Sequence, residues 1–196
     1  MRVCVFCASS AHIDQKYFEA TKRLAEAFID AQVGVVFGGG AEGLMGALAD
    51  VMSDGGGKIQ GVMPHFMKEV EWAHPKVKDF IFVETMHQRK AKLIEDIDAL
   101  VALPGGTGTL EELFEIITLK RLGRFTKPIV ILNTDGYYDP LVQMLNNCVA
   151  EKFMNPKHLD MWTFVNDAHE VLPAIAASPI WKEDAINYAT LKQEDL

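Results

Sequence analysis

Short apolar runs rich in β-branched residues alternate along this chain with longer stretches of helical periodicity. The short runs lack the polar alternation of a half-exposed strand, so we expect strands buried on both faces. The expected strands are Val3–Ala8, Val33–Phe37, Ile59–Met63, Phe80–Val83, Ala99–Leu103, Ile129–Leu132 and Thr163–Val165. The expected helices are Tyr17–Ala31, Leu44–Asp54, Met86–Asp96, Leu110–Leu122, Pro140–Lys152 and Asp167–Ala177. This order predicts an α/β fold, with a doubly wound, mostly parallel sheet and helices on both faces.

Length and composition limit the classes of protein that remain. The 196 residues predict one domain, with about 178–196 as a polar C-terminal extension. Hydrophobic residues at 49% and charged residues at 23% exclude general disorder, and three cysteines exclude a disulfide scaffold. A net charge of −8 disfavours non-specific binding to nucleic acid or to a membrane surface. With no signal-peptide pattern and no apolar run of about 18 residues, we expect a cytoplasmic protein outside membranes.

One glycine-rich segment, the 104–109 loop, follows the expected strand Ala99–Leu103 and reads Pro-Gly-Gly-Thr-Gly-Thr. Glycines let a backbone approach a ligand, and a helix expected to start near Thr109 adds N–H groups and a positive dipole end. Thr107 and Thr109 add hydroxyl donors. The loop therefore predicts a phosphate site. Because no Gly-Lys-Ser/Thr follows, the phosphate would serve as a handle for binding instead of a group to be transferred.

A second glycine-rich segment, the 38–46 loop, follows the expected strand Val33–Phe37. It contains G-x-G-x-x-G at Gly38, Gly40 and Gly43, in the strand-to-helix context of a dinucleotide fingerprint. The fingerprint usually follows the first strand and has an acidic residue about 20 positions later, after the next strand. Here that next strand is followed by Pro64. A tight turn, or one wall of a nucleotide site, is the preferred interpretation over NAD binding.

Glu112 has two interpretations. Thr109-x-x-Glu112 has the spacing of a helix capping box, in which the glutamate only returns a hydrogen bond to the helix start. A catalytic carboxylate beside the 104–109 loop is the other possibility. Neighbouring residues on a helix point about 100° apart, so we expect only one of Glu111 and Glu112 to face the loop.

Two cations follow the expected strand Phe80–Val83, in a helix whose apolar stripe includes Met86 and Leu93. Helical spacing places Lys90 inside that stripe and Arg89 at its edge. Lys90 could extend its ammonium group to solvent. Alternatively, both cations point into a ligand crevice and pair with a phosphate or with Glu112.

Cys4-x-x-Cys7 has the spacing of a redox or metal motif. In a strand, however, residues three apart point to opposite faces, so we favour two buried structural thiols. The six histidines show no metal spacing such as H-E-x-x-H, and no G-x-S-x-G nucleophile elbow is present. We therefore expect neither a metal nor another cofactor.

Several motifs occur together in one order. They are P-G-G-x-G-T-x-x-E from Pro104 to Glu112, M-H-x-R-K from Met86 to Lys90, G-G-G-x-x-G-L-M-G from Gly38 to Gly46, and Gly61-Val62-Met63-Pro64. This set resembles the LONELY GUY (LOG) family of cytokinin-activating phosphoribohydrolases, whose members are often labelled lysine decarboxylases. The resemblance covers at least residues 1–175. No lysine has a recognisable pyridoxal-phosphate context, so the residues do not support the decarboxylase label.

The resemblance implies a Rossmann-like fold, a homodimer and hydrolysis of the N-glycosidic bond of a nucleoside 5′-monophosphate. The implied substrates are AMP or its N6-isoprenoid derivatives, and the products are the free base and ribose 5-phosphate. Arg89 and Glu112 match the family's catalytic pair. The expected substrate-binding residues are Gly39, Gly40, Glu71, Met86, Lys90, Gly105, Gly106, Thr107, Gly108, Thr109, Leu110, Glu111 and Thr118. Thr118 lies two turns beyond Glu111 on its helix, so we expect its reach to a ligand to require the second subunit.

Two other functions stay open from the residues alone. A non-catalytic nucleotide-binding module would use the same 104–109 loop without releasing a base. An NAD-dependent oxidoreductase would use the 38–46 loop and bind a nicotinamide cofactor. In the hydrolase interpretation, an ionised Glu112 stabilises the ribosyl cation, orients the attacking water, or does both.

Overall fold

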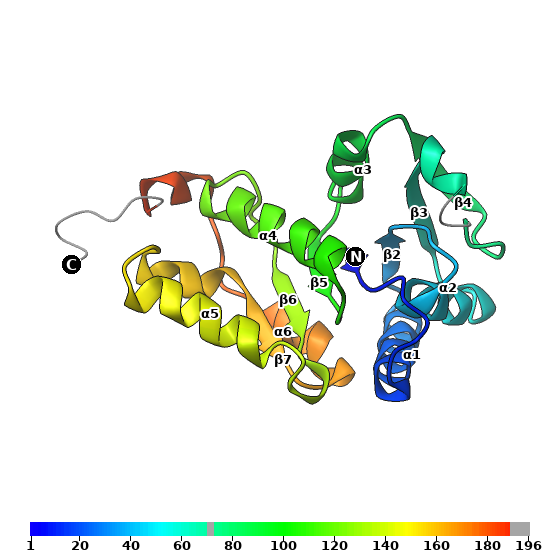
Figure 1. Ribbon diagram of the computed structural model, residues 1–196, viewed down its shortest axis with the longest axis horizontal. Helices are drawn as coiled ribbons and strands as arrows, with labels where there is room; N and C mark the ends of the chain where they lie inside the picture. The colour runs from blue at the N-terminus through cyan, green and yellow to red at the C-terminus, as the bar shows by residue number, and fades with distance from the viewer. Residues whose placement is uncertain (70–72, 189–196) are drawn as a thin grey trace.

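The computed structural model describes residues 1–69 and 73–188, and these form a seven-stranded sheet in which every strand runs parallel to its neighbours (Figure 1). The order across the sheet is β4-β3-β2-β1-β5-β6-β7. The strands are β1 (Arg2–Phe6), β2 (Gly34–Phe37), β3 (Ile59–Pro64), β4 (Asp79–Val83), β5 (Ala99–Ala102), β6 (Ile129–Leu132) and β7 (Thr163–Val165). The predicted Rossmann-like, doubly wound sheet is confirmed.

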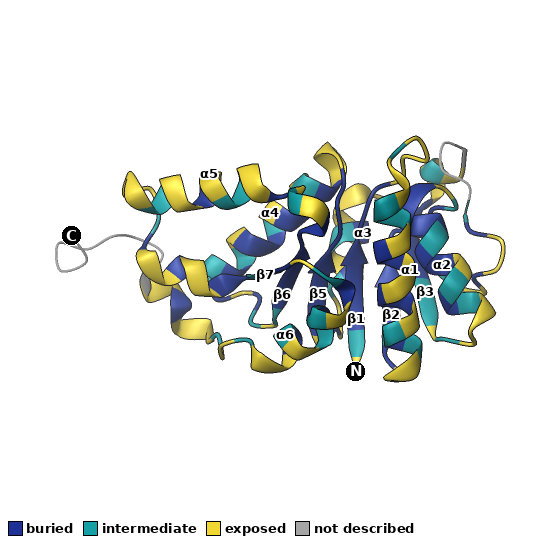
Figure 2. Cartoon of the chain, turned by 90° about the horizontal axis from the view of Figure 1, so that it is seen from below, coloured by how far each residue is buried: buried dark blue, intermediate teal, exposed yellow. Residues whose placement is uncertain are grey.

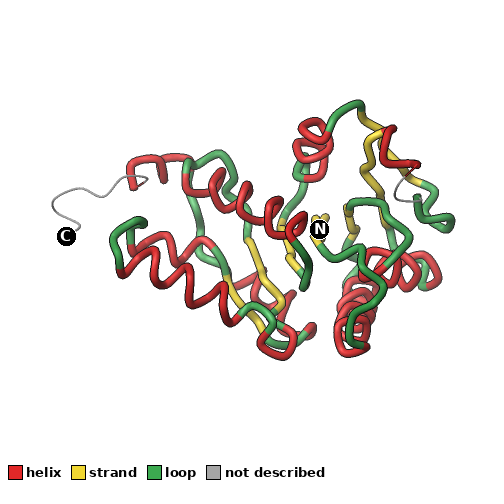
Figure 3. Tube along the Cα trace, in the orientation of Figure 1, coloured by secondary structure: helices red, strands yellow, loops and turns green. Residues whose placement is uncertain are grey.

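Helices cover both faces of this sheet. They are α1 (Gln15–Asp30), α2 (Gly43–Asp54), α3 (Met86–Leu93), α4 (Thr107–Arg121), α5 (Asp139–Ala150) and α6 (Val171–Ala177). Helices α1, α2 and α6 share one apolar core with the sheet, and α3, α4 and α5 share the other. Figure 2 shows the buried strands between helices whose outer surfaces are exposed. Helices, strands and loops alternate along the trace (Figure 3).

Alternate residues of each strand enter opposite cores, as parallel strands with two covered faces require. In β1, Val3 and Val5 pack with α1 and α2, whereas Cys4 and Phe6 pack on the other face. Cys7 lies on the same side as Val5, opposite Cys4. Both thiols are buried and neither forms a disulfide, so the predicted pair of buried structural cysteines is confirmed.

A long connection creates the crevice of this fold. The chain builds β1 to β4 outward to one edge and then returns through α3 to place β5 beside β1, with Val3 opposite Ala99. The helices that follow these two central strands, α1 and α4, lie on opposite faces. The carboxyl ends of β1 and β5 are therefore not covered by a helix, and such a switch point is where ligands bind in doubly wound sheets.

Several elements begin or end away from their predicted limits. Strands β1 and β5 are shorter than expected, which leaves Cys7, Ala8 and Leu103 in loops above the sheet. Helix α4 starts at Thr107 instead of Leu110, because Gly106 serves as its extended N-cap residue. Helix α3 stops at Leu93, three residues early, and Asp96 beyond it has a positive φ of 54° that no α-helix continues.

The last two elements of the chain also differ from the expectation. The segment Asp167–Ala177 is divided into a 3₁₀ turn and α6, with Asp167 capping the turn. Beyond it, the described residues 178–188 pack against α4: the Trp181 indole donates a hydrogen bond to the Lys120 carbonyl at 2.7 Å, and Ala185 is buried. This part of the expected polar extension therefore contributes to the core. In residues 1–69 and 73–188, no helix has both the length and the apolar character to cross a membrane.

Candidate functional site

A pocket of about 290 Å³ opens at the switch point between β1 and β5. Its walls come from four parts of the chain. These are residues 5–10 at the end of β1, Gly38 and Met45 of the 38–46 loop, Arg89 of α3, and residues 106–109 together with Glu112 of α4. Small-ligand pockets in proteins start at about this volume. The pocket therefore brings both predicted glycine loops and both predicted catalytic residues to one place.

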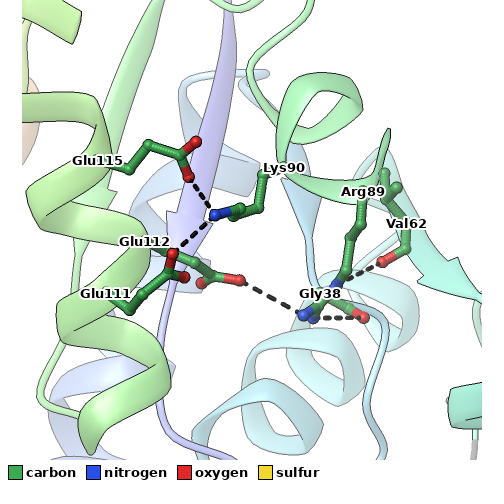
Figure 4. A network of polar contacts seen from close by, with 7 residues as sticks. All are labelled: Gly38, Val62, Arg89, Lys90, Glu111, Glu112 and Glu115. Carbon is green, nitrogen blue, oxygen red and sulfur yellow. Dashed lines mark hydrogen bonds and ion pairs between the residues drawn. The ribbon is translucent and has the colours of Figure 1, made fainter. Parts of the chain in front are cut away.

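Arg89 is held on three sides. Its Nε donates to the Val62 carbonyl at 3.2 Å, one terminal nitrogen donates to the Gly38 carbonyl at 3.3 Å, and the other lies 3.4 Å from a Glu112 carboxylate oxygen (Figure 4). The side chain is 8% exposed. A capping box formed by Thr85 and Gln88 fixes the start of α3 just before it. The guanidinium group is therefore pre-positioned, with its orientation set by β3 and the 38–46 loop.

Glu112 faces the pocket from the second turn of α4, and its side chain is 14% exposed. The capping-box interpretation is wrong, because the N-cap residue is Gly106, which makes no side-chain cap hydrogen bond, and Thr109 is buried inside the first turn. Glu111, the neighbouring carboxylate, is exposed and does not line the pocket. As expected, only one of the two faces the loop crevice.

Lys90 lies at the rim of the same region. Its Nζ contacts carboxylate oxygens of Glu111 at 2.7 Å and Glu115 at 2.8 Å, and these two partners raise the pKa of the lysine to about 12. The ammonium group therefore ties α3 to α4 (Figure 4). The predicted order of burial is wrong: Arg89 is the more deeply buried cation, since it turns toward the crevice where two backbone carbonyls and Glu112 receive it.

The 104–109 loop presents an open backbone to the pocket. Gly106, Thr107 and Gly108 are exposed, and a Cβ added to either glycine would meet nothing within 4 Å. Neither glycine has a positive φ, so the backbone itself does not demand glycine there. The first N–H groups of α4 lie in this segment, and such groups have no partner inside their own helix. This arrangement suits an anion such as a phosphate.

The glycines of the 38–46 loop are instead enclosed by the protein. A Cβ on Gly38 would overlap the Arg89 guanidinium, and one on Gly46 would overlap the Ala41 carbonyl oxygen. Gly43 has a positive φ of 62° and packs against the backbone of Ser9. The tight-turn interpretation fits these contacts. Gly38 also lines the pocket, which makes the end of this turn one wall of the site.

The remaining predicted substrate-binding residues are placed less directly. Gly39, Gly40 and Gly105 lie within the two loops and Leu110 follows the second loop, but none of them lines the pocket. Met86, expected in an apolar stripe, is 37% exposed at the start of α3. Thr118 is exposed on α4, where its hydroxyl donates to the Phe114 carbonyl at 2.8 Å. Glu71 lies outside the described residues.

One wall of the site is not among the residues expected from the sequence. Residues Cys7 to Ser10, which follow β1, line the pocket, and Ser9 and Ser10 present exposed side chains there. The rule that ligands bind at a switch point was a usable signal. Applying it required the strand order, in which β1 lies beside β5, and the sequence pattern did not reveal that order.

The chain is similar in sequence to several known proteins. A family model described as "Possible lysine decarboxylase" matches residues 45–175. Cytokinin riboside 5′-monophosphate phosphoribohydrolase LOG2 of Arabidopsis thaliana is 42% identical, over 79% of this chain and 72% of its own length. The probable phosphoribohydrolase LOGL1 of Oryza sativa subsp. japonica is 35% identical, over 98% of this chain and 91% of its own. The chain belongs to the LOG family.

Solved structures of other proteins share the fold of this LOG-family chain. The molybdenum cofactor binding protein of Rippkaea orientalis has a TM-score of 0.67 at 16% identity, covering 90% of this chain and 95% of that one. The molybdenum cofactor carrier protein of Chlamydomonas reinhardtii has a TM-score of 0.67 at 17% identity, covering 89% and 95%. At such identities the comparison shows a shared architecture alone.

The decarboxylase description does not match the pocket of this LOG-family member. Pyridoxal-phosphate enzymes hold their cofactor through a lysine Schiff base. Among the residues that line the described pocket none is a lysine, and the nearest lysine in sequence to Arg89, Lys90, is paired with two carboxylates at the rim. The charged side chains among the described lining residues are instead Arg89 and Glu112, whose charged groups lie 3.4 Å apart.

Proposed function

We propose that this protein hydrolyses the N-glycosidic bond of a nucleoside 5′-monophosphate, with AMP or an N6-isoprenoid derivative as substrate. The observation that carries the proposal is the Arg89–Glu112 pair, 3.4 Å apart, in the same pocket as the open backbone of the 104–109 loop. The names of the relatives LOG2 and LOGL1 support the same reaction. The products are the free base and ribose 5-phosphate.

The 5′-phosphate is the handle in this proposal. It would accept hydrogen bonds from the backbone around Gly106 and Gly108, at the positive end of α4, with the Thr107 hydroxyl nearby. Glu112 begins the second turn of the same helix. Binding energy from the phosphate would therefore fix the ribose over the carboxylate, which lowers the entropic cost of reaching the transition state.

Glu112 acts as an anion in the bond-breaking step. The bond between ribose C1′ and the base nitrogen breaks, its electron pair leaves with the base, and positive charge develops on the ribose ring. The carboxylate stabilises that charge and orients a water molecule, whose oxygen bonds to C1′ while its proton balances the departing base. The adjacent Arg89, 3.4 Å away, fixes the direction of the carboxylate.

We also propose a homodimer and a cytoplasmic location for a single-domain protein. The exposed face of α4 carries Phe114, which is 40% exposed, and Thr118, which does not reach the pocket of its own chain. A second copy packed on this face would cover the phenyl ring and give Thr118 a site to contact. Cys4, Cys7 and Cys148 form no disulfide, which suits a reducing compartment. Light scattering on the purified protein tests the dimer.

Incubation with AMP, followed by chromatography for adenine and ribose 5-phosphate, tests the reaction. We expect Glu112→Gln to keep the fold and AMP binding but to slow base release about 10²–10³-fold, the usual loss when one group that stabilises transition-state charge is removed. Glu26→Gln, an exposed change of the same charge on α1, is the matched control. Unchanged turnover by Glu112→Gln would contradict the role of the carboxylate. AMP binding by the wild-type protein without adenine release would favour a non-catalytic nucleotide-binding module.

A further inference from the structure

Two tyrosines outside the pocket bind the backbone of the 104–109 loop region. The Tyr138 hydroxyl donates to the Leu103 carbonyl at 2.7 Å, and the Tyr137 hydroxyl donates to the Gly105 carbonyl at 2.7 Å. Between them, the Pro104 carbonyl accepts from the Ala8 amide at 3.3 Å. Three consecutive carbonyl oxygens, beyond the last residue of β5, are therefore held by donors from other parts of the chain.

The Tyr137 contact fixes a particular peptide plane. In a trans peptide the C=O and the following N–H point in opposite directions. The Gly105 carbonyl belongs to the same plane as the Gly106 N–H, so a bond that holds this carbonyl toward Tyr137 turns the Gly106 N–H away from it. A peptide between two glycines rotates with little steric resistance. If it rotated, a carbonyl oxygen would replace a donor beside a bound anion.

The segment that carries the tyrosines is itself firmly held. The Asn133 side chain accepts from the Tyr138 amide at 2.6 Å and donates to Asp139 at 2.8 Å. Asp135, which has a positive φ of 53°, forms an ion pair with Lys16 at the start of α1. Backbone strain of this kind persists only where the surroundings enforce it. The segment that carries the Tyr137 hydroxyl is therefore held in a fixed position.

Ring packing completes the support. The Tyr137 ring meets the Tyr138 ring edge-on with centroids 4.9 Å apart, and it meets the Tyr17 ring edge-on at 5.7 Å. Tyr138 is 2% exposed, and burial raises its hydroxyl pKa, so the hydroxyl stays a donor at neutral pH. Tyr17 belongs to α1, which follows the wall of the pocket formed by Cys7 to Ser10. The tyrosine cluster thus joins that wall to the 104–109 loop.

We propose that Tyr137 is a positioning residue for recognition of the 5′-phosphate. Its hydroxyl holds the Gly105–Gly106 peptide so that the Gly106 N–H faces the pocket as an anion donor. This inference rests on the proposed function, because it assigns the phosphate of the substrate to the 104–109 loop. It predicts that loss of the hydroxyl weakens recognition of the phosphate and leaves the chemistry at C1′ unaltered.

The variant Tyr137→Phe removes the hydroxyl and keeps the ring contacts. Tyr17→Phe is the matched control, since within residues 1–69 and 73–188 the Tyr17 hydroxyl makes no hydrogen bond to the 104–109 loop. Calorimetry measures binding of ribose 5-phosphate, and steady-state kinetics measures KM and kcat with AMP and with adenosine, which lacks the phosphate. Melting temperature is recorded for each variant.

We expect Tyr137→Phe to raise the Kd for ribose 5-phosphate and the KM for AMP by about fivefold or more, as for one lost hydrogen bond. Its kcat with AMP, its kcat/KM with adenosine and its melting temperature should match those of Tyr17→Phe. Equal losses with AMP and adenosine, or equal losses in the two variants, would overturn the inference, because they would indicate a general structural effect.

The inference and the proposed function fail in different ways. Binding of ribose 5-phosphate that depends on Tyr137, without hydrolysis of AMP by the wild-type protein, would overturn the reaction and support the positioning role. Hydrolysis of AMP by both proteins with unchanged affinity for ribose 5-phosphate would overturn the positioning role alone. Absence of ribose 5-phosphate binding to the wild-type protein would overturn the phosphate site on which both depend.

Discussion

The 38–46 loop and the 104–109 loop are both glycine-rich turns between a strand and a helix, yet their glycines serve different ends. In the 38–46 loop, added methyl groups at Gly38 and Gly46 would overlap protein atoms. In the 104–109 loop, added methyl groups at Gly106 and Gly108 would enter open space beside the pocket. Where the packing of the protein does not require the glycine, the open space beside it can admit a ligand. The steric surroundings therefore distinguish two glycine-rich motifs whose sequences look alike.

The two loops also differ in how their backbone groups are used. The Gly38 carbonyl accepts from Arg89, and the Gly39 carbonyl accepts from the His74 amide at 3.0 Å. The carbonyls of residues 103–105 accept hydrogen bonds from other parts of the chain. Residues 106–108 are exposed and line the pocket. One loop therefore stabilises the protein, and the other leaves part of its backbone open to the pocket. The comparison leads to different expectations for the same Gly→Ala change.

Gly46→Ala should destabilise the protein strongly. Alanine normally stabilises a helix relative to glycine, but here its methyl group would overlap the backbone oxygen of Ala41, which cannot move freely. We expect the free energy of unfolding to fall by about 3 kcal/mol, in the upper range for overpacking. Urea unfolding measures this as a lower midpoint. A midpoint equal to that of the wild-type protein would mean that the 38–46 loop does not need its glycines.

Arg89→Ala removes the side chain that contacts the 38–46 loop through the Gly38 carbonyl and helix α4 through Glu112. We expect kcat/KM for AMP to fall at least about tenfold, or about 1.4 kcal/mol, because Glu112 loses the group that orients it. Lys92→Ala, on the same helix but paired with Glu95 at the surface, is the control and should keep normal kinetics. Equal kinetics in the two variants would show that Arg89 has only a structural role.

Gly108→Ala should separate stability from binding. The position is in the first turn of α4 with open space around it, so alanine should raise the free energy of unfolding by about 0.5–1 kcal/mol. The same methyl group would occupy the space assigned to the ligand, and we expect the Kd for ribose 5-phosphate to rise about fivefold, or roughly 1 kcal/mol. Thermal unfolding and calorimetry measure the two effects. Tighter or unchanged binding would contradict the assignment of this loop to the phosphate.

A pH effect is expected at the support of the 38–46 loop, and it is the smallest effect that we expect. Burial lowers the pKa of His74, whose ring lies 3.6 Å from Asp50 and whose amide binds Gly39. Below the ordinary histidine pKa the unfolded chain therefore binds more protons than the folded one, and stability falls as the pH drops from about 7 to 5. His74→Gln should reduce this dependence. The exposed His87→Gln should retain it, and an identical pH profile in both variants would contradict the expectation.

The fold was predictable because its strands are buried on both faces, which leaves a simple apolar signal at each one. The motifs then placed Arg89 and Glu112 on helices at the correct edge. The ends of the elements were harder to predict. Helix α4 starts at Thr107 instead of Leu110, because Gly106 adopts an extended N-cap conformation. That shift is why the capping-box interpretation of Glu112 was plausible and wrong.

Features of the site that depend on distant contacts were out of reach. The burial of Arg89 is set by carbonyls 27 and 51 residues away in sequence, and helical spacing alone assigned the deeper position to Lys90. The Tyr137 contact with Gly105 spans 32 residues. The wall formed by Cys7 to Ser10 depends on the adjacency of β1 and β5. Periodicity reports which face of an element is apolar, but not which segment of the chain will meet it.

The order of strands divides the molecule into two continuous stretches of chain that meet between β1 and β5. Residues 5–10, Gly38, Met45 and Arg89 of the pocket come from the first stretch, and residues 106–109 with Glu112 come from the second. A nucleotide seated between them would act as a non-covalent cross-link across this seam. At a concentration one hundred times its Kd, such a ligand adds about 2.7 kcal/mol to the stability of the folded chain. Resistance to heat would then report how fully the seam is occupied.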